Sequence, residues 1–354
     1  MTGSVQSDVY FSGRDGYRAF RIPVIETAAD GTLLAFAEAR KYNFGDPGTE
    51  NNDIDLVLKR SEDGGRTWSR MMVIEDPGEK WSAANPAVVL DRQSGRVWVH
   101  YLRCKPGRGS DMARPGTDDA QNLVRYSDDH GASWSEPEDI TAVCRDMADS
   151  QWRCTVAGPG GGIQDRKGRL VVPCWKTKPF EVFAVFSEDH GRTWERGGMT
   201  PGSAALGGNE DQLVELADGR LLLDFRQGDG PNRWTVVSGD GGRTWSKPAP
   251  GQAVTPVCCA VERYTLKSAG ADRNRIVWTG PKGPDRANLV VRISYDEAGT
   301  FTGERLIADE PAAYSDMALL KDGSVGVLWE RGDYQYITFT RLDRDFLEPR
   351  AGLK

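Results

Sequence analysis

An eight-residue phrase with the pattern Ser-x-Asp-x-Gly-x-Thr-Trp recurs along the chain and constrains its fold more than any other feature. Four close copies, SEDGGRTW, SDDHGASW, SEDHGRTW and SGDGGRTW, begin at Ser61, Ser127, Ser187 and Ser238, and a degenerate copy, SYDEAGTF, begins at Ser294. Ser and Asp side chains can bond to nearby backbone N–H groups, and Gly adopts positive φ angles at no steric cost. We therefore expect each copy to form a hairpin turn with the Trp packed behind it, in a protein built from repeats.

A second periodic element lies between the copies of this phrase. Six segments place apolar and β-branched runs on both sides of a Gly- or Asp-containing turn, which is typical of a β-hairpin. They span residues 24–40, 87–103, 162–175, 213–226, 262–280 and 317–331. Six units of about four short strands, with almost no helical periodicity, predict an all-β fold, namely a six-bladed β-propeller with four-stranded antiparallel blades.

Length and charge agree with this architecture and exclude two classes of function. A closed array of repeats can use all 354 residues, so we expect a single domain over residues 1–354. The net charge of −7 argues against nucleic-acid binding, which needs a basic face. No apolar run approaches about 18 residues, so the sequence predicts no membrane span.

The inventory of reactive side chains narrows the chemistry further. The chain has three His, and two of them, His130 and His190, lie within copies of the repeated phrase. A zinc site built on His, or a Ser-His-Asp triad, is therefore not expected. Six Cys are too few for a disulfide scaffold, and nothing predicts a metal or an organic cofactor. The first residues show no signal peptide, so we expect a cytoplasmic protein, or a secreted one if a leader has been removed.

The repeated phrase resembles the Asp-box of sialidases, which lies on the outer rim of a β-propeller. Further sialidase landmarks follow in order along the chain: FRIP at residues 20–23, Glu210, Arg226, Arg286, Tyr314 and Glu330. The resemblance extends from residue 9 to about residue 346. It implies an exo-α-sialidase, which hydrolyses terminal α-linked sialic acids from glycoconjugates and retains the anomeric configuration through a tyrosyl-sugar intermediate.

The charge of the implied substrate gives a common role to three of these residues, the arginines. Sialic acids carry a carboxylate on the anomeric carbon, and guanidinium groups pair with a carboxylate in bidentate geometry. The resemblance implies that Arg21, Arg226 and Arg286 bind this carboxylate together. It also implies that Glu330 orients Arg21.

The same charge bears on the nucleophile. A carboxylate nucleophile would be repelled by the substrate's own carboxylate in a desolvated site, and sialidases are known exceptions that attack with a Tyr. The resemblance implies that Tyr314 is the nucleophile and that Glu210 is the base that takes its proton.

The acid/base residue is where the sequence departs from the family pattern. Sialidases place an Asp in the loop before the strand at 54–61, where this chain reads GDPGTENNDID from Gly45. A four-residue insertion makes Asp46 the counterpart, which we prefer, whereas a gapless count gives Glu50, and Asp53 is a third candidate. Arg40 resembles a further Arg that lines the pocket in the family.

Two other hypotheses share these features. The same machinery could act on a related nonulosonic or ulosonic acid, or transfer the sugar instead of hydrolysing it. A non-catalytic sugar-binding propeller is disfavoured, because a binding module has no need of the Tyr–Glu pair. The expected partners are sialylated glycans or free sialosides, and the sequence predicts no oligomeric state.

Overall fold

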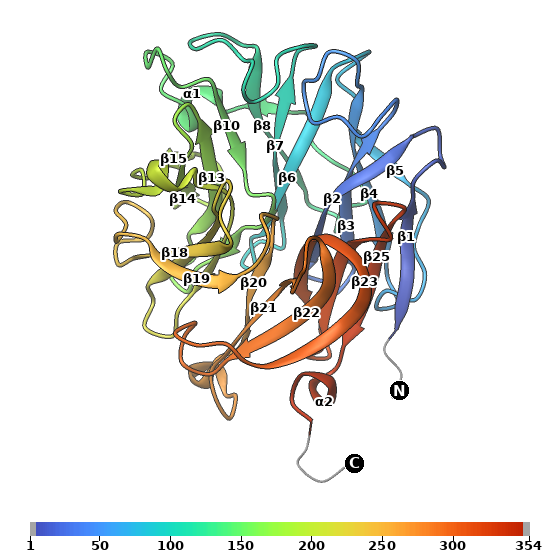
Figure 1. Ribbon diagram of the computed structural model, residues 1–354, viewed down its shortest axis with the longest axis vertical. Helices are drawn as coiled ribbons and strands as arrows, with labels where there is room; N and C mark the ends of the chain where they lie inside the picture. The colour runs from blue at the N-terminus through green and yellow to red at the C-terminus, as the bar shows by residue number, and fades with distance from the viewer. Residues whose placement is uncertain (1–4, 350–354) are drawn as a thin grey trace.

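The computed structural model describes residues 5–349 and consists almost entirely of β-strands (Figure 1). Strands contain 48% of the residues and helices contain 4%, which confirms the prediction of an all-β fold. The helical segments are short: α1 (Thr141–Cys144), α2 (Arg344–Leu347), and the 3-10 turns Ser203–Leu206 and Lys267–Ala269. None of the helices in the described part of the chain is long and apolar enough to cross a membrane.

The strands form four sheets. The largest contains β2 (Ala19–Thr27), β3 (Leu33–Arg40), β4 (Ile54–Ser61), β5 (Met72–Glu75), β6 (Ser82–Leu90), β7 (Val97–Cys104), β8 (Ala120–Ser127), β9 (Glu138–Asp139) and β11 (Gly160–Gly161). The next contains β10 (Cys154–Ala157), β12 (Ile163–Gln164), β13 (Leu170–Thr177), β14 (Glu181–Ser187) and β15 (Glu195–Arg196). The third contains β16 (Asn209–Glu215), β17 (Leu221–Arg226), β18 (Asn232–Ser238) and β19 (Ala249–Ala253). The last contains β20 (Ala260–Thr265), β21 (Arg275–Pro281), β22 (Ala287–Ser294), β23 (Thr302–Leu319), β24 (Val325–Arg331), β25 (Tyr336–Leu342) and β1 (Gln6–Phe11).

All six hairpins predicted from the sequence are present. They are the antiparallel pairs β2–β3, β6–β7, β12–β13, β16–β17, β20–β21 and β23–β24. A Gly at positive φ stands in each turn, for example Gly31 at 98° and Gly323 at 81°. This backbone conformation is the one that tight hairpins need and that other residues rarely adopt. The turn signals in the sequence therefore fixed where the strands reverse.

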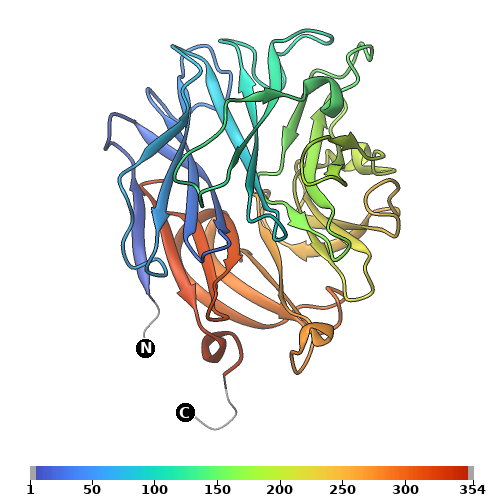
Figure 2. The ribbon, with the colours of Figure 1, turned by 180° about the vertical axis from the view of Figure 1, so that it is seen from behind.

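The two ends of the described chain lie side by side. The first strand, β1, pairs antiparallel with β25, from Gln6 opposite Thr340 to Phe11 opposite Tyr336. Figures 1 and 2 show the sheets following one another round the molecule in sequence order, so that the blue and red segments meet. The chain thus closes back on its own beginning through backbone hydrogen bonds.

Each copy of the repeated phrase forms the same hydrogen-bonded turn. In the first copy, Ser61 Oγ donates to Asp63 Oδ1 and accepts from Gly65 N, each at 2.9 Å. Asp63 also accepts from the backbone N–H and the hydroxyl of Thr67. The equivalent bonds recur in the other copies, including the degenerate one. Because their Asp and Ser side chains make these hydrogen bonds within the turn itself, the turns are structural.

The turns also pack against the neighbouring strands. A Cβ added to Gly65 would lie 2.0 Å from the ring of Phe339, and one added to Gly191 would lie 2.2 Å from Trp98. The Trp at the end of the phrase is buried at Trp194 and Trp245. It is only partly buried in the copies that end at residues 68 and 134. The expectation of a Trp packed behind the turn therefore holds most fully in the middle of the chain.

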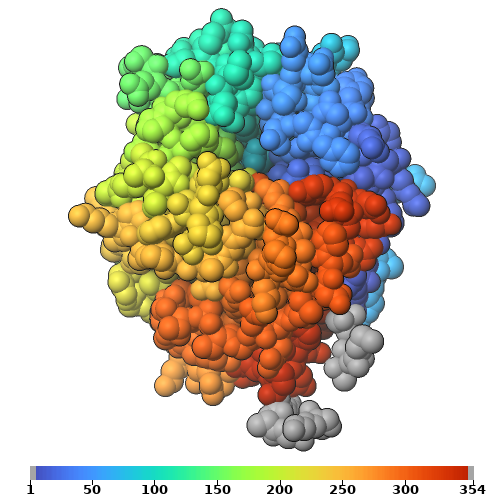
Figure 3. Space-filling model, viewed as in Figure 1, coloured from blue at the N-terminus to red at the C-terminus, as the bar shows by residue number. Residues whose placement is uncertain are grey.

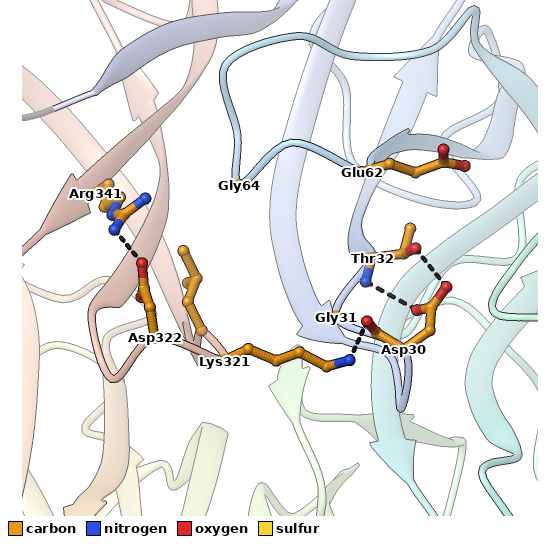
Figure 4. A pocket seen from close by; sticks show the side chains of 9 residues that line it. Asp30, Gly31, Thr32, Glu62, Gly64, Lys321, Asp322 and Arg341 are labelled. Atoms are coloured by element: carbon orange, nitrogen blue, oxygen red, sulfur yellow. Dashed lines mark hydrogen bonds and ion pairs between the residues drawn. The ribbon is translucent and has the colours of Figure 1, made fainter.

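A polar cavity of about 350 Å³ lies between the tips of the first and last hairpins (Figure 4). Its charges are already satisfied within the protein. Lys321 Nζ donates to the backbone carbonyl of Asp30, and Arg341 pairs with Asp322. We regard this cavity as part of the contact that joins the two ends of the chain.

Three carboxyl groups from three strands approach one another beneath a larger cavity of about 450 Å³. They belong to Glu26 on β2, Glu262 on β20 and Asp316 on β23. Burial, and then the neighbouring Glu26 and Asp316, raise the pKa of Glu262 to about 8, against a smaller opposing effect of Arg92. Burial raises the pKa of Glu26 to about 7, and that of Asp316 to about 6.

These pKa values predict a pH-dependent stability. Between about pH 4.5 and pH 8 the unfolded chain ionises Glu262 freely, whereas the folded chain must keep its proton or accept a disfavoured charge. The stability that this group contributes is therefore complete below about pH 4.5 and is lost as the pH rises towards 8. Glu262→Gln should flatten the decline in unfolding free energy between pH 5 and pH 8, measured by urea denaturation. Glu195→Gln, at an exposed position, is the matched control, and an equal slope in both variants would contradict the assignment.

Candidate active site

A separate cavity of about 290 Å³ gathers most of the residues predicted from the sequence. It lies where strands from all four sheets meet, and Figure 3 shows this face hollowed near its middle. None of its lining residues is shared with the polar cavity between the hairpin tips. The lining consists of Arg21, Ile22, Glu38, Arg40, Asp46, Pro47, Asn85, Leu102, Ser110, Val156, Trp175, Glu210, Arg226, Arg286 and Tyr314.

Irregularities in four strands point side chains into this cavity. The pairing register shifts between Arg21 and Val24 in β2, and at equivalent points in β6, β16 and β23. Three residues at these bulges have positive φ: Ile22 at 56°, Asn85 at 50° and Glu210 at 22°. A bulge bends its strand and re-aims the local side chains. These strained positions, which are costly for non-Gly residues, coincide with the cavity wall.

Arg21 is held by Glu330, the partner that the resemblance implies for it. Arg21 Nε lies 2.5 Å from Glu330 Oε1, and Nη2 lies 3.2 Å from Oε2. The Glu330 carboxylate also accepts from the backbone N–H groups of Ile22 and Tyr314, at 3.0 and 3.2 Å. Burial opposes charge on Arg21, but Glu330 more than offsets it and raises the pKa of Arg21. Arg21 is therefore a fixed cation at the cavity wall.

Glu210, Arg226 and Tyr314 form one hydrogen-bonded group. Tyr314 OH donates to Glu210 Oε1, and Arg226 Nη1 donates to Glu210 Oε2 at 2.7 Å. Arg226 Nη1 also lies 3.2 Å from Tyr314 OH. Burial, followed by the charge of Glu210, raises the pKa of Tyr314 well above its ordinary value. The phenol is therefore neutral near pH 7, and a group positioned to remove its proton is already in contact.

Arg286 completes the set of three arginines around the Tyr314 ring. Its guanidinium carbon lies 5.3 Å from the ring centroid, and that of Arg21 lies 5.4 Å away. Arg286 donates to Tyr334 OH at 3.0 Å and to the Pro256 carbonyl at 3.1 Å. In the described part of the chain no carboxylate forms a salt bridge with Arg286, unlike Arg21 and Arg226. Its direct hydrogen-bonding partners are therefore neutral oxygen atoms.

Tyr334 was not predicted from the sequence. It lies in the turn between β24 and β25, and its ring stacks under Arg21 at 4.2 Å while its hydroxyl bonds to Arg286. One tyrosine thus contacts two of the three arginines. An isolated Tyr in a turn gives no sequence signal, and only the close approach of β2, the 282–286 segment and this turn reveals it.

The three candidates for the acid/base lie in very different places. Asp46 lines the cavity, with its side chain 84% exposed and its Oδ1 3.2 Å from Arg40 Nη1. Asp53 is buried and accepts from the backbone of Lys80 at 3.0 Å, outside the cavity lining. Glu50 is exposed on the same loop and is likewise absent from the lining. The geometry therefore favours Asp46.

Arg40 is oriented by Glu38, a second residue that the sequence did not single out. Glu38 Oε2 accepts from Arg40 Nη2 at 2.6 Å and from Nε at 3.0 Å. Its other oxygen accepts from Asn85 N at 2.9 Å, on the bulge of β6. Both ionic side chains are buried, so the pair is fully hydrogen-bonded where an unpaired charge would be costly.

Three large apolar side chains form much of the remaining wall of the cavity, which also includes Ser110. Leu102 on β7, Val156 on β10 and Trp175 on β13 are buried and face the same space. They come from residues 102–175, whereas Glu210, Tyr314 and the three arginines around the Tyr314 ring come from β2 and from residues 210–314. The cavity therefore has an ionic side and an apolar side.

The described residues contain no cluster of three or more His, Cys, Asp or Glu that could hold a metal ion. All six cysteines are buried free thiols, and burial raises the pKa of Cys258, which lies beneath the site.

Comparison with known proteins agrees with this arrangement. The sialidase of Micromonospora viridifaciens is 30% identical over 353 residues, covering 92% of this chain and 52% of that protein. The sialidase of Bacteroides fragilis is 30% identical over 91% of this chain and 62% of its own length. This chain thus spans a little over half the length of these curated relatives.

Solved structures show the same fold. A Hadza microbial sialidase matches 96% of this chain and 68% of its own with a TM-score of 0.85 at 24% identity. An intramolecular trans-sialidase from Ruminococcus gnavus matches 96% of this chain and 98% of its own with a TM-score of 0.83 at 19% identity. The resemblance to sialidases inferred from the sequence is confirmed. Residues 31–327 match the model of the BNR repeat-like domain, and the chain belongs to that family.

Proposed function

We propose that this chain is a retaining exo-α-sialidase whose catalytic unit is one six-bladed β-propeller domain over residues 1–354. Six hairpins, five repeated turns and the pairing of β1 with β25 support the count of six blades and their closure. In this arrangement the repeated turns lie on the outer rim as Asp-boxes, and the inner strands β2, β6, β10, β16, β20 and β23 surround the axis. The cavity then lies at one end of that axis.

The three arginines suit a substrate that is anionic at its reacting carbon. Arg21 and Arg226 are neutralised in part by Glu330 and Glu210, whereas Arg286 is bonded only to neutral groups. A substrate carboxylate would supply the missing negative charge and accept planar, bidentate hydrogen bonds. The cavity of about 290 Å³ is near the lower end of small-molecule sites, about 300–1,000 Å³. It therefore suits one terminal sugar.

The contact between Tyr314 and Glu210 is the observation that carries the mechanism. Tyr314 OH attacks the anomeric carbon as its proton passes to Glu210, and the bond to the leaving oxygen breaks. The arginines around the ring stabilise the phenolate character that develops on Tyr314. A neutral phenol avoids the repulsion that a carboxylate nucleophile would meet beside the substrate's carboxylate.

In this mechanism Asp46 acts first as the general acid for the leaving group and then as the general base for the attacking water. Protonated Asp46 gives its proton to the departing glycosidic oxygen, and the resulting carboxylate then takes one from the water that attacks the tyrosyl-sugar bond. Tyr314 leaves as a phenolate and regains its proton from Glu210, which restores the starting state. Two displacements at one carbon retain its configuration.

The apolar side of the cavity bears on the choice of sugar. Leu102, Val156 and Trp175 offer no hydrogen-bonding partner except the indole N–H, which already donates to the Gly158 carbonyl at 3.0 Å. Such a wall can pack against the methyl of an N-acyl substituent, whereas a hydroxyl at the same position would gain neither packing nor a hydrogen bond there. A sialic acid is therefore preferred over its deaminated analogue as the substrate.

Transfer to the sugar's own hydroxyl is the second candidate outcome of the same chemistry. It is suggested by the fold likeness to the Ruminococcus gnavus intramolecular trans-sialidase and by 31% identity to an anhydrosialidase of Macrobdella decora over 59% of this chain. The first displacement is common to both outcomes. They differ in whether water or an internal hydroxyl attacks the intermediate, and the product distinguishes them.

The covalent intermediate provides the main test. Incubation with a 3-fluorinated sialosyl fluoride, which slows both steps but retains a good leaving group, should add one sugar mass to the peptide that contains Tyr314. Tyr314→Phe keeps the ring and its packing, so it should fold normally and lose turnover of a sialyl disaccharide by several orders of magnitude. Early NMR spectra should show the α anomer of the free sugar first. A label on a carboxylate, or the β anomer first, would overturn the mechanism, and a cyclised product without free sugar would favour transfer.

The acid/base assignment predicts a dependence on the leaving group. Asp46→Ala should lower kcat/KM for a sialyl disaccharide by about 10²–10⁴-fold, because a sugar alkoxide must be protonated to depart. Hydrolysis of an activated aryl sialoside should change far less, because an aryloxide departs without a proton. Glu50→Gln and Asp53→Asn are parallel controls. If only Glu50→Gln shows this dependence, the assignment to Asp46 is wrong.

Tyr334 should contribute to binding and not to proton transfer. Tyr334→Phe keeps the ring under Arg21 but removes the hydroxyl that orients Arg286, a loss of about 0.5–1.5 kcal/mol. Titration with an unreactive sialic-acid analogue should show Kd raised about 2- to 10-fold, with the leaving-group dependence unchanged. Tyr295→Phe removes the hydroxyl of an exposed Tyr bonded to Glu348 and serves as control. Equal affinities in the two variants would remove Tyr334 from the site.

A further inference from the structure

Two loops at the rim of the cavity meet through glycines. The loop at 41–53 carries Asp46, and the loop at 105–119 faces it across the cavity mouth. A Cβ added to Gly109 would lie 2.4 Å from the carbonyl oxygen of Pro47. A Cβ added to Gly48 would lie 2.3 Å from Gly109 Cα. The two backbones are therefore in direct contact, with no room for a side chain on either.

Position 109 requires Gly because of this backbone contact, and not because of its own backbone conformation. Gly48 has φ of 72°, which favours Gly whatever lies nearby, but Gly109 is not among the residues with positive φ. Any L-residue could adopt its backbone conformation. The obstacle to a side chain is only the neighbouring backbone, which cannot rotate away as a flexible side chain can.

The loop at 105–119 is firmly held on the side of Gly109. The Gly109 carbonyl accepts from the N–H groups of Met112 and Ala113, at 2.8 and 2.9 Å. The next carbonyl, that of Ser110, accepts from the buried Thr177 hydroxyl at 2.7 Å. The carbonyl of Asp111 accepts from Arg153 at 2.9 Å. These bonds fix the surface against which Pro47 and Gly48 rest.

The loop at 41–53 depends on that surface to place Asp46. Gly48 N donates to Ser82 Oγ at 2.9 Å, and Asn52 Nδ2 donates to the Gly45 carbonyl at 2.7 Å. The Asp46 carboxyl itself, 84% exposed, has only the 3.2 Å contact with Arg40 among the described residues. Its position over the cavity is therefore set by the backbone on which it stands, next to Pro47.

We propose that Gly109 is a positioning residue for the acid/base step, through the contact of its backbone with Pro47 and Gly48. The inference rests on the proposed function and on Asp46 as the acid/base. We expect a side chain at 109 to displace the 45–49 turn, because Thr177 and Arg153 tie the carbonyls next to Gly109 to other segments, whereas the Asp46 carboxyl has only its contact with Arg40 among the described residues. Proton transfer needs Asp46 within hydrogen-bond reach of the glycosidic oxygen, and a displacement of about 1 Å can cost about 10²-fold in rate.

Gly109→Ala tests this with two substrates. We expect kcat/KM for a sialyl disaccharide to fall about 10- to 100-fold, and that for an activated aryl sialoside to fall less than about 3-fold. Kd for an unreactive sialic-acid analogue should stay the same, because Arg21, Arg226 and Arg286 are untouched. The control is Gly239→Ala, at a position with ordinary φ and no atom within 4 Å of the added Cβ. If Gly109 had a merely structural role, kcat/KM for both substrates and the affinity for the analogue would fall together. Either that outcome or unchanged kcat/KM values would overturn the proposal.

A second variant covers the case in which Gly109→Ala does not fold. Thr177→Val keeps the shape of a buried side chain but removes the hydrogen bond that ties the Ser110 carbonyl. This variant should make the backbone around Gly109 more mobile and show the same leaving-group dependence as Gly109→Ala, but more weakly. If Thr177→Val shows no leaving-group dependence, that result counts against the proposal. If the natural chain cleaves neither substrate, the proposed function fails. If Asp46→Ala shows the dependence and both loop variants do not, only the inference about Gly109 fails.

Discussion

The carboxylate of Glu330 is the point on which the site depends. It is completely buried and accepts four hydrogen bonds, two from Arg21, one from Ile22 N and one from Tyr314 N. A buried carboxylate is tolerated only when its charge and lone pairs are satisfied in this way. The same bonds join the bulge of β2 to that of β23, the first and last strands that face the cavity. One side chain thus fixes Arg21, proposed to bind the substrate carboxylate, and the backbone of the proposed nucleophile together.

The distribution of charge around the cavity fits the proposed anionic substrate, even though the protein as a whole is acidic. Arg21, Arg40 and Arg226 each have a carboxylate partner, which offsets the cost of burying their charge. Arg286 has none among the described residues and relies on Tyr334 and the Pro256 carbonyl. Within an overall charge of −7, Arg286 is thus the cavity arginine that has hydrogen-bonding capacity but no carboxylate partner among the described residues.

Much of this could be predicted from the sequence because the relevant signals are local. A Gly in a turn between two β-branched runs specifies a hairpin by itself, and the repeated phrase satisfies its own backbone within eight residues. Most of the residues taken from the resemblance to sialidases also line one cavity. What could not be predicted depends on close approach between distant segments. Tyr334 meets Arg286 and Gly109 meets Pro47 only after the sheets have packed. The acid/base stayed ambiguous because Asp46, Glu50 and Asp53 differ in exposure and direction, which spacing along a loop does not encode.

The pairing of β1 with β25 has a consequence for how the protein is made. Residues 6–11 are among the first to leave the ribosome, and their partner at 336–342 is among the last. The edge of β1 therefore remains without its partner strand while almost the whole chain is synthesised. An unpaired strand edge can associate with other chains. Arg21 and Glu330 likewise lie 309 positions apart. Under the proposed function, the arginine that Glu330 orients therefore cannot reach its final position until the last strands of the chain have been synthesised.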